Sequence, residues 1–200
     1  MIHQARGFSY FSTGRYSYAI KDFNQTLELN PADRYTLVWR GSAHNHLGQF
    51  DEAVNDFTEA SRLSPNDSDA YRLRAWANFS LKKYEQAAAD YSKVIELDPS
   101  KPANYYDRAC ALAKAEKSAD ALRDLDTAIA MAPSQPQTGR MLRLRASVRS
   151  EIGDNEGALA DLIRGEALAC STAKSTFFCA KPFVHLREQI RTSAQVPKGT

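Results

Sequence analysis

Between Tyr35 and Leu63 the apolar residues follow the spacing of a helix, with one interruption. The first run ends at Leu47, where Gly48 follows, and the second ends at Leu63, shortly before Pro65. Glycine commonly terminates a helix, and proline cannot continue one because it lacks the N–H and clashes with the preceding turn. This stretch therefore predicts two helices joined by a tight turn.

The same pattern returns at a constant interval along the chain, and several independent columns share that interval. The columns are Pro31, Pro65, Pro99 and Pro133; Ala19, Ala53, Ala87 and Ala121; Phe23, Phe57, Tyr91 and Leu125; and Gly7, Gly41, Ala75 and Ala109. A fifth copy with Ala146, Ala158 and Leu162 follows a three-residue insertion in "PSQPQTGR". One hairpin cannot bury its apolar surface alone, so the copies predict an all-α solenoid of stacked antiparallel hairpins.

The packing within one unit also follows from the residue types. Gly41 and Ala53 are small, so the two helix backbones can approach closely, and Phe50 and Phe57 fill the remaining space. In the fourth copy, Glu116 and Ser118 stand where the glycine and the aromatic residue are expected.

The stretch "RGSAHNHLGQFDEAVNDFTEASRLSP" carries these residues in one run. Its spacing resembles the tetratricopeptide repeat, and the resemblance extends over residues 1–169. It implies a right-handed superhelix of five repeats, with approximate bounds 1–32, 33–66, 67–100, 101–134 and 138–169. The fifth repeat departs from the family at Arg149, in a column that is usually aromatic.

The two ends of the chain call for separate interpretations. Met1 falls just inside the first expected helix without a capping residue, which favours excision from a longer protein. Residues 170–194 are expected to form a linker and a capping helix, with Phe183, Leu186 and Ile190 on its apolar face. Residues 195–200 are expected to be a frayed tail.

Charge and hydropathy narrow the choice of partner. The chain has 26 basic and 24 acidic residues, a net charge of +2, which is too balanced to favour nucleic acid or a membrane surface. Residues 140–200 carry 10 basic and 6 acidic side chains. No apolar run predicts a membrane span, and the absence of a visible signal peptide leaves cytoplasm and bacterial periplasm open.

The sequence contains no recognisable catalytic set, phosphate loop or metal-ligand pattern, which predicts a protein without enzyme activity or cofactor. His44 and His46 are two apart on a helix, so their side chains point in different directions and cannot share a metal. Cys110 is interpreted as a small core or groove residue. Cys170 and Cys179 are interpreted as free thiols, with a disulfide as the alternative.

Two polar columns run through the repeats, one of arginines and one of aspartates. The number of residues between the arginine and the aspartate is the same in every repeat. The columns are Arg6, Arg40, Arg74, Arg108 and Arg145 on the first helices, and Asp22, Asp56, Asp90, Asp124 and Asp161 on the second helices. An antiparallel hairpin brings the columns to similar height, which favours a structural ladder of ion pairs. A row of arginines for an anionic ligand is the alternative.

In tetratricopeptide arrays the first helices line a concave groove, which implies a peptide ligand. The resemblance assigns Gln4, Phe8, Phe11, Tyr35, Val38, Asn45, Arg72, Trp76, Phe79, Tyr106, Lys114, Arg140 and Arg143 to this groove, with Ser42, Cys110 and Ser147 in the same columns. The aromatic members predict an apolar recognition patch, and the basic ones predict an acidic ligand. The alternative is a groove filled by the C-terminal segment or by another subunit.

The family's clamp for chaperone C-termini uses lysines and asparagines, but this chain has Gln4, Phe8, Trp39 and Ser42 in those columns. The missing clamp disfavours a co-chaperone role of that kind. Taken together, the sequence predicts a non-enzymatic module that binds a protein or peptide. The style of the repeats suggests a bacterial protein, and a homo-oligomer is possible. The alternative is a repeat arm that positions substrates in a larger enzyme or secretion machine. RNA binding is disfavoured by the near-neutral charge.

Overall fold

The computed structural model describes residues 2–172, which form ten α-helices without a strand in that range. The chain comprises two compact units, Met1–Pro99 and Ser100–Thr200. The expected capping helix around residues 183–190, the tail 195–200 and the side chains of Cys170 and Cys179 lie outside the described part. The expected all-α fold of helical hairpins is confirmed.

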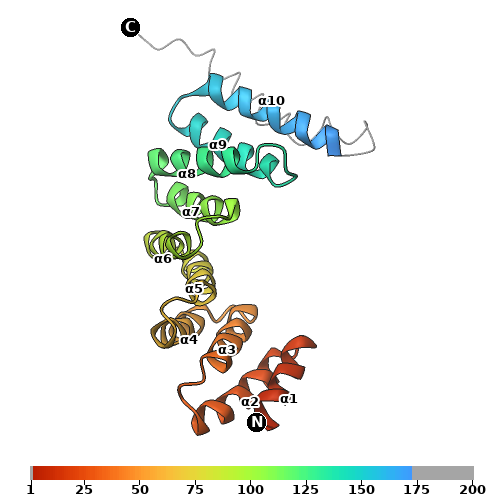
Figure 1. The fold of residues 1–200 in the computed structure, drawn as a ribbon, viewed down its shortest axis with the longest axis vertical. Coiled ribbons are helices and arrows are strands. Elements are labelled where there is room, and N and C mark those ends of the chain that lie inside the picture. Colours follow the sequence, from red (N-terminus) through yellow and green to blue (C-terminus); the bar gives the residue numbers. More distant parts are fainter. Residues whose placement is uncertain (1, 173–200) are drawn as a thin grey trace. The chain divides into compact units, whose positions relative to one another are not determined.

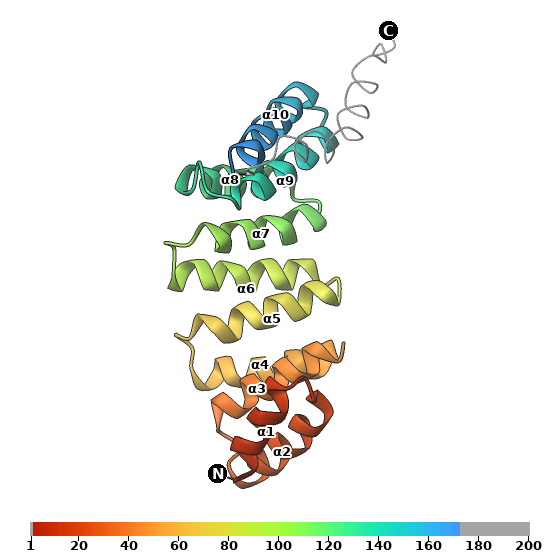
Figure 2. The same ribbon diagram turned by 90° about the vertical axis from the view of Figure 1, so that its right-hand side faces the viewer.

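Three hairpins build the first unit, and in each one a shorter helix packs on a 14-residue helix (Figures 1 and 2). The helices are α1 (Ile2–Ser12), α2 (Tyr16–Leu29), α3 (Arg34–His46), α4 (Phe50–Leu63), α5 (Ser68–Ser80) and α6 (Tyr84–Leu97). Helix α2 packs on α3 and α4 packs on α5, so each hairpin stacks on the next. The first helices α1, α3 and α5 also contact one another in turn, so their outer sides form one surface.

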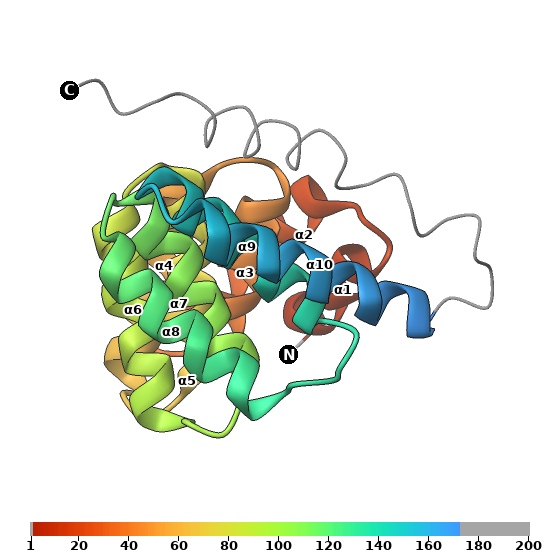
Figure 3. The same ribbon diagram turned by 90° about the horizontal axis from the view of Figure 1, so that it is seen from above.

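The second unit contains two further hairpins within its described residues. They are α7 (Pro102–Lys114) with α8 (Ser118–Met131), and α9 (Thr138–Glu151) with α10 (Asn155–Thr172), the last pair side by side in Figure 3. The three-residue insertion lies in the connection between α8 and α9. Pro102 opens α7 at a position where a missing N–H costs no helix bond.

The core of each hairpin depends on a close approach of its helices. A Cβ added at Gly41 would lie 2.8 Å from the Phe57 ring, and one at Gly7 would lie 2.8 Å from the Phe23 ring. Both rings are fully buried and cannot swing into solvent. In these two hairpins the phenylalanine of the second helix therefore occupies the space that a side chain on the first helix would need, whereas the third hairpin combines Ala75 with Tyr91 in the same columns.

The turn between the helices of a hairpin requires a left-handed residue. Gly14, Gly48 and Gly153 take φ values of 74°, 73° and 85° there. Lys82 and Glu116 occupy the same place with φ of 61° and 60°, a conformation that side chains with a Cβ adopt at a cost. Two hairpins thus carry backbone strain that the others avoid.

Relieving this strain at Lys82 is expected to stabilise the protein. Lys82→Gly should raise the free energy of unfolding by about 0.5–1 kcal/mol, because glycine adopts positive φ without steric cost. Lys82→Ala removes the same charge but keeps the Cβ, so it should give no gain. Urea unfolding of the three proteins tests this, and an equal effect of both substitutions would contradict it.

Candidate peptide-binding surfaces

Exposed aromatic rings gather on the surface formed by α1 and α3. Phe8 and Phe11 of α1 meet the Trp39 ring edge-on, with ring centroids 4.9 and 5.1 Å away. Phe8 remains 47% exposed although it packs against Trp39. Phe11 also contacts Tyr16, which stacks flat on His46 with centroids 4.4 Å apart. The rings are held in place by one another and still present apolar surface to solvent.

Helix α5 continues this aromatic surface. Trp76 is 48% exposed and its ring lies 5.7 Å from that of Phe50, edge-on. Phe79 is half-buried and packs in the same way against Tyr84, with centroids 5.3 Å apart. Neither ring is buried between helices, so Trp76 and Phe79 remain available for contact.

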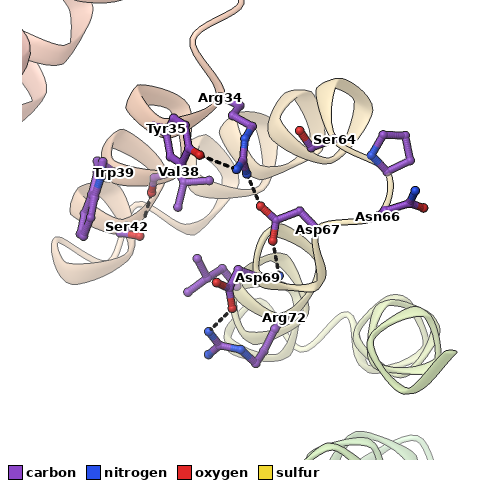
Figure 4. A pocket seen from close by; sticks show the side chains of 12 residues that line it. Arg34, Tyr35, Val38, Trp39, Ser42, Ser64, Asn66, Asp67, Asp69 and Arg72 are labelled. Atoms are coloured by element: carbon purple, nitrogen blue, oxygen red, sulfur yellow. Dashed lines mark hydrogen bonds and ion pairs between the residues drawn. The ribbon is translucent and has the colours of Figure 1, made fainter. Parts of the chain in front are cut away.

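A groove of about 940 Å³ lies between α3, the connection 64–67 and α5 (Figure 4). Tyr35, Val38 and Trp39 form its apolar wall on α3, and Leu73 contributes from α5. Ser42, Ser64 and Asn66 place polar groups around them. A concave, mostly apolar site with a few polar groups is the usual form of a binding site.

The charged groups of this groove are already paired with one another. Arg34 forms an ion pair with Asp67, and its guanidinium lies 4.1 Å from the centroid of the Tyr35 ring. Arg72 donates to the Asp69 carboxylate at 2.8 Å (Figure 4). The carboxylate of Asp69, three residues away, therefore already pairs with Arg72. This pairing weighs against the expectation that Arg72 attracts an acidic ligand.

Two of the residues that the sequence analysis assigned to the groove surface are partly or fully buried in the structure. Gln4 is half-buried and donates to Asp33 at 2.8 Å and to Thr36 at 3.0 Å, which ties α1 to the start of α3. Asn45 is only 8% exposed, so its assignment to the groove surface is corrected: it is a buried residue. Its Oδ1 is the one buried side-chain polar atom without a hydrogen bond in the described part of the chain.

The second unit has a separate hollow of about 440 Å³ between α7 and α9. Tyr106 lines it from α7, and Arg140, Arg143 and Ser147 line it from α9 together with Leu144. Both arginines are exposed, and no carboxylate is among the lining residues. Lys114 lies exposed at the other end of α7, where it does not line this hollow.

Cys110 and Tyr106 form a neutral pair beside this hollow. Burial raises the pKa of the Cys110 thiol to about 11, and burial raises the pKa of the Tyr106 hydroxyl to about 12. Both groups are therefore protonated at neutral pH, and the thiol is a poor nucleophile. No group of three metal-binding side chains occurs within residues 2–172, and no helix there is long and apolar enough to cross a membrane.

The arginine and aspartate columns meet in every hairpin. In each pair the arginine Nη2 donates to an oxygen of a buried aspartate at 2.5–2.6 Å, and the arginine Nε donates to the same carboxylate. The pairs are Arg6–Asp22, Arg40–Asp56, Arg74–Asp90, Arg108–Asp124 and Arg145–Asp161. Such forked contacts fix the geometry as well as the charge.

The ion pair also sets the titration of Asp22. The hydrogen bond from Arg6 lowers the pKa of Asp22 below its usual value. A carboxylate with a lowered folded-state pKa stabilises the fold above its unfolded pKa, and this contribution is lost as the pH falls through the folded-state pKa.

The arginines make a further contact that the sequence analysis missed. Arg40 donates to Asn24 at 2.8 Å, Arg74 to Thr58 at 3.2 Å and Arg145 to Asp126 at 2.6 Å, each on the preceding hairpin. These acceptors belong to a polar column that keeps the interval of the repeats and could have revealed the contact: Asn24, Thr58, Ser92 and Asp126. The arginine thus links three helices and joins neighbouring repeats.

Arg149, the departure noted in the fifth repeat, has a similar role. It donates to Asp161 at 2.9 Å and to the carbonyl of Gly157 at 3.2 Å. A second arginine therefore replaces the usual aromatic ring by joining the ion pair of Arg145 and Asp161.

Comparisons with known proteins agree with this architecture. The family model described as Tetratricopeptide repeat matches residues 5–67, 46–102 and 106–171. Two solved structures of MamA are similar at 18% identity, with TM-scores of 0.78 and 0.80; they cover 84% and 88% of this chain and 97% and 94% of their own. MamA 41-end from Desulfovibrio magneticus RS-1 gives a TM-score of 0.80 at 17% identity, covering 86% of this chain and 96% of that one. The comparison with curated proteins gives no match. At this identity the likeness to these structures shows the fold alone.

Proposed function

We propose that this chain, which belongs to the tetratricopeptide repeat family, holds a partner's peptide segment against the aromatic surface of α1, α3 and α5. Tetratricopeptide repeats form protein–protein interaction scaffolds, so the partner is a protein. The observation that carries the proposal is the set of exposed rings, above all Phe8 and Trp76, each braced by a second ring. An exposed ring held rigid loses little entropy on binding and buries a large apolar area.

The groove of α3 and α5 favours an apolar anchor over a charged one. Arg34 and Arg72 are each paired with an aspartate, so a ligand charge would compete with an existing ion pair. The wall of Tyr35, Val38 and Trp39 offers apolar contact without such competition. We therefore assign the apolar side chain of the ligand to this groove.

Acidic residues of a ligand are assigned to the hollow of the second unit. Arg140 and Arg143 are three apart on α9 and share a face, with the Tyr106 and Ser147 hydroxyls beside them. Both guanidinium groups are exposed, so they can donate hydrogen bonds to an acidic side chain that enters this hollow. The Cys110 thiol next to this hollow is protonated at neutral pH and is therefore a poor nucleophile.

The aromatic contact is tested with peptides selected from a random displayed library against the full chain. Trp76→Ala should weaken the selected peptides by about 30-fold, mainly through a faster off-rate, because a buried aromatic anchor contributes on the order of 2 kcal/mol. Tyr18→Ala is the matched control, since Tyr18 is an exposed ring on the second helix α2. Equal dissociation constants for wild type and Trp76→Ala, measured by fluorescence polarisation, would refute the proposed surface.

A further inference from the structure

The first residue of the second helix is aromatic in three hairpins and serine in the fourth. Tyr16, Phe50 and Tyr84 open α2, α4 and α6, and each packs its ring against a neighbouring ring 5.3–5.7 Å away. Ser118 opens α8 in the same column and has no ring to offer. The fourth hairpin therefore lacks the ring that fills this place in the first three hairpins, and the fifth has Asn155 there.

A hollow of about 560 Å³ lies at this position. Glu116, Lys117 and Ser118 line it, with Leu122 of α8 and Ile152 after α9. Ile152 is a large apolar side chain and is 54% exposed. The volume falls within the range of about 300–1,000 Å³ that is usual for ligand sites.

The rim of this hollow carries two carboxylates, one of which is already paired with an arginine. Glu116 and Asp120 supply the carboxylates that line it, and Lys117 supplies the one ammonium group in the lining. Asp120 forms an ion pair with Arg123 on the exposed side of α8, whereas Glu116 is exposed to solvent. The exposed Glu116 carboxylate can therefore pair with a cation of a ligand that enters this hollow.

We propose that this hollow receives an aromatic side chain of a partner protein, with a lysine or arginine next to it in the partner's sequence. The partner ring takes the place that Tyr16, Phe50 and Tyr84 occupy in the first three hairpins, and covers Leu122 and Ile152. The neighbouring cation pairs with Glu116. This site is separate from the groove of α3 and α5, and it does not depend on the function proposed for that groove.

The probes are three short peptides titrated into the isotope-labelled full chain. They are acetyl-Lys-Phe-Lys-amide, acetyl-Glu-Phe-Glu-amide and acetyl-Lys-Ala-Lys-amide. The first should shift the amide resonances of residues 116–122 and 152, and should bind about tenfold more tightly than the alanine peptide, because only it buries a ring. The glutamate peptide should bind more weakly than the first, and this difference should shrink as salt is added.

Filling the hollow from within provides the decisive variant. Ser118→Phe should abolish the shifts, whereas Thr127→Phe, which adds a ring to the exposed face of the same helix, should leave them unchanged. If Ser118→Phe does not fold, Ile152→Ser removes the apolar floor and should weaken the first peptide to the level of the alanine peptide.

Three results would overturn the proposal. The alanine peptide could bind as tightly as the phenylalanine peptide, or Ser118→Phe could retain the shifts. Concentration-dependent shifts at residues 116–122 without any peptide would identify a second copy of the chain as the occupant.

Discussion

Replacing Asp56 by asparagine is expected to lower the free energy of unfolding by about 2–3 kcal/mol. The Asp56 carboxylate is buried and accepts hydrogen bonds from Nε and Nη2 of Arg40, whose side chain is itself mostly covered. Removing one partner leaves an uncompensated charge in a poorly hydrated place, which typically costs about 3–5 kcal/mol when both groups are fully buried. The remaining exposure of Arg40 reduces this value.

The matched control is Asp69→Asn, which breaks an ion pair of the same residue types on the surface. Arg72 and Asp69 are both well exposed, so its loss should cost at most about 1 kcal/mol. Both variants are measured by urea unfolding, together with Arg40→Gln and the double variant. Since Arg40 and Asp56 share one interaction, the double variant should lose less than the sum. Strictly additive losses would show that the pair does not hold the hairpin together.

The arginine column also explains why the repeats stack as well as fold. Arg40 and Arg74 donate to the preceding hairpin through Nη1 while Nε and Nη2 stay on their own aspartate. One guanidinium therefore supports both a hairpin and its junction with the one before. Loss of the aspartate should loosen that junction too, because the arginine loses the anchor that orients its outer nitrogen.

The hairpins followed from the sequence because each depends on residues whose physical role is local. Gly48 supplies a left-handed turn, Pro65 ends a helix, and Gly41 leaves room for Phe57. These requirements recur at one constant interval, so independent columns gave the same architecture. The partners of the arginine column followed in the same way, because the separation from arginine to aspartate does not change from one repeat to the next.

The candidate binding surface was harder to derive from the sequence. The exposure of a side chain there depends on neighbouring side chains that do not recur at the interval of the repeats. Asn45 stands in a groove column, yet it is buried, while Phe79 one period later is half-exposed. Arg72 was expected to attract an acidic ligand, and the structure places Asp69 beside it. In the sequence, the hollow at Ser118 shows only as a serine in a column that is aromatic in the first three repeats. The sequence does not tell whether another side chain fills the space of the missing ring.

The second large effect is expected at Gly41. Gly41→Ala should lower the free energy of unfolding by about 2 kcal/mol, because the new Cβ would lie 2.8 Å from the buried Phe57 ring and 3.1 Å from the Asp56 Cβ. The gain of up to about 1 kcal/mol in helix propensity offsets only part of this overlap. Gly139→Ala is the control, since its Cβ would meet no atom closer than 3.9 Å, and it should be neutral or stabilising.

The fourth hairpin contains a compensating change, whereas the third hairpin combines Ala75 with the Tyr91 ring. Gly7 and Gly41 face Phe23 and Phe57, whereas in the fourth hairpin Ala109 stands in the glycine column and Leu125 in the phenylalanine column. Phe57→Leu alone should leave a cavity and cost about 1–2 kcal/mol. In the double variant the alanine Cβ enters the space that the ring vacates, so its loss should be at least about 1 kcal/mol smaller than the sum of the two single losses. Additive losses in urea unfolding would mean that the ring does not determine the glycine, and the packing account of this column would fail.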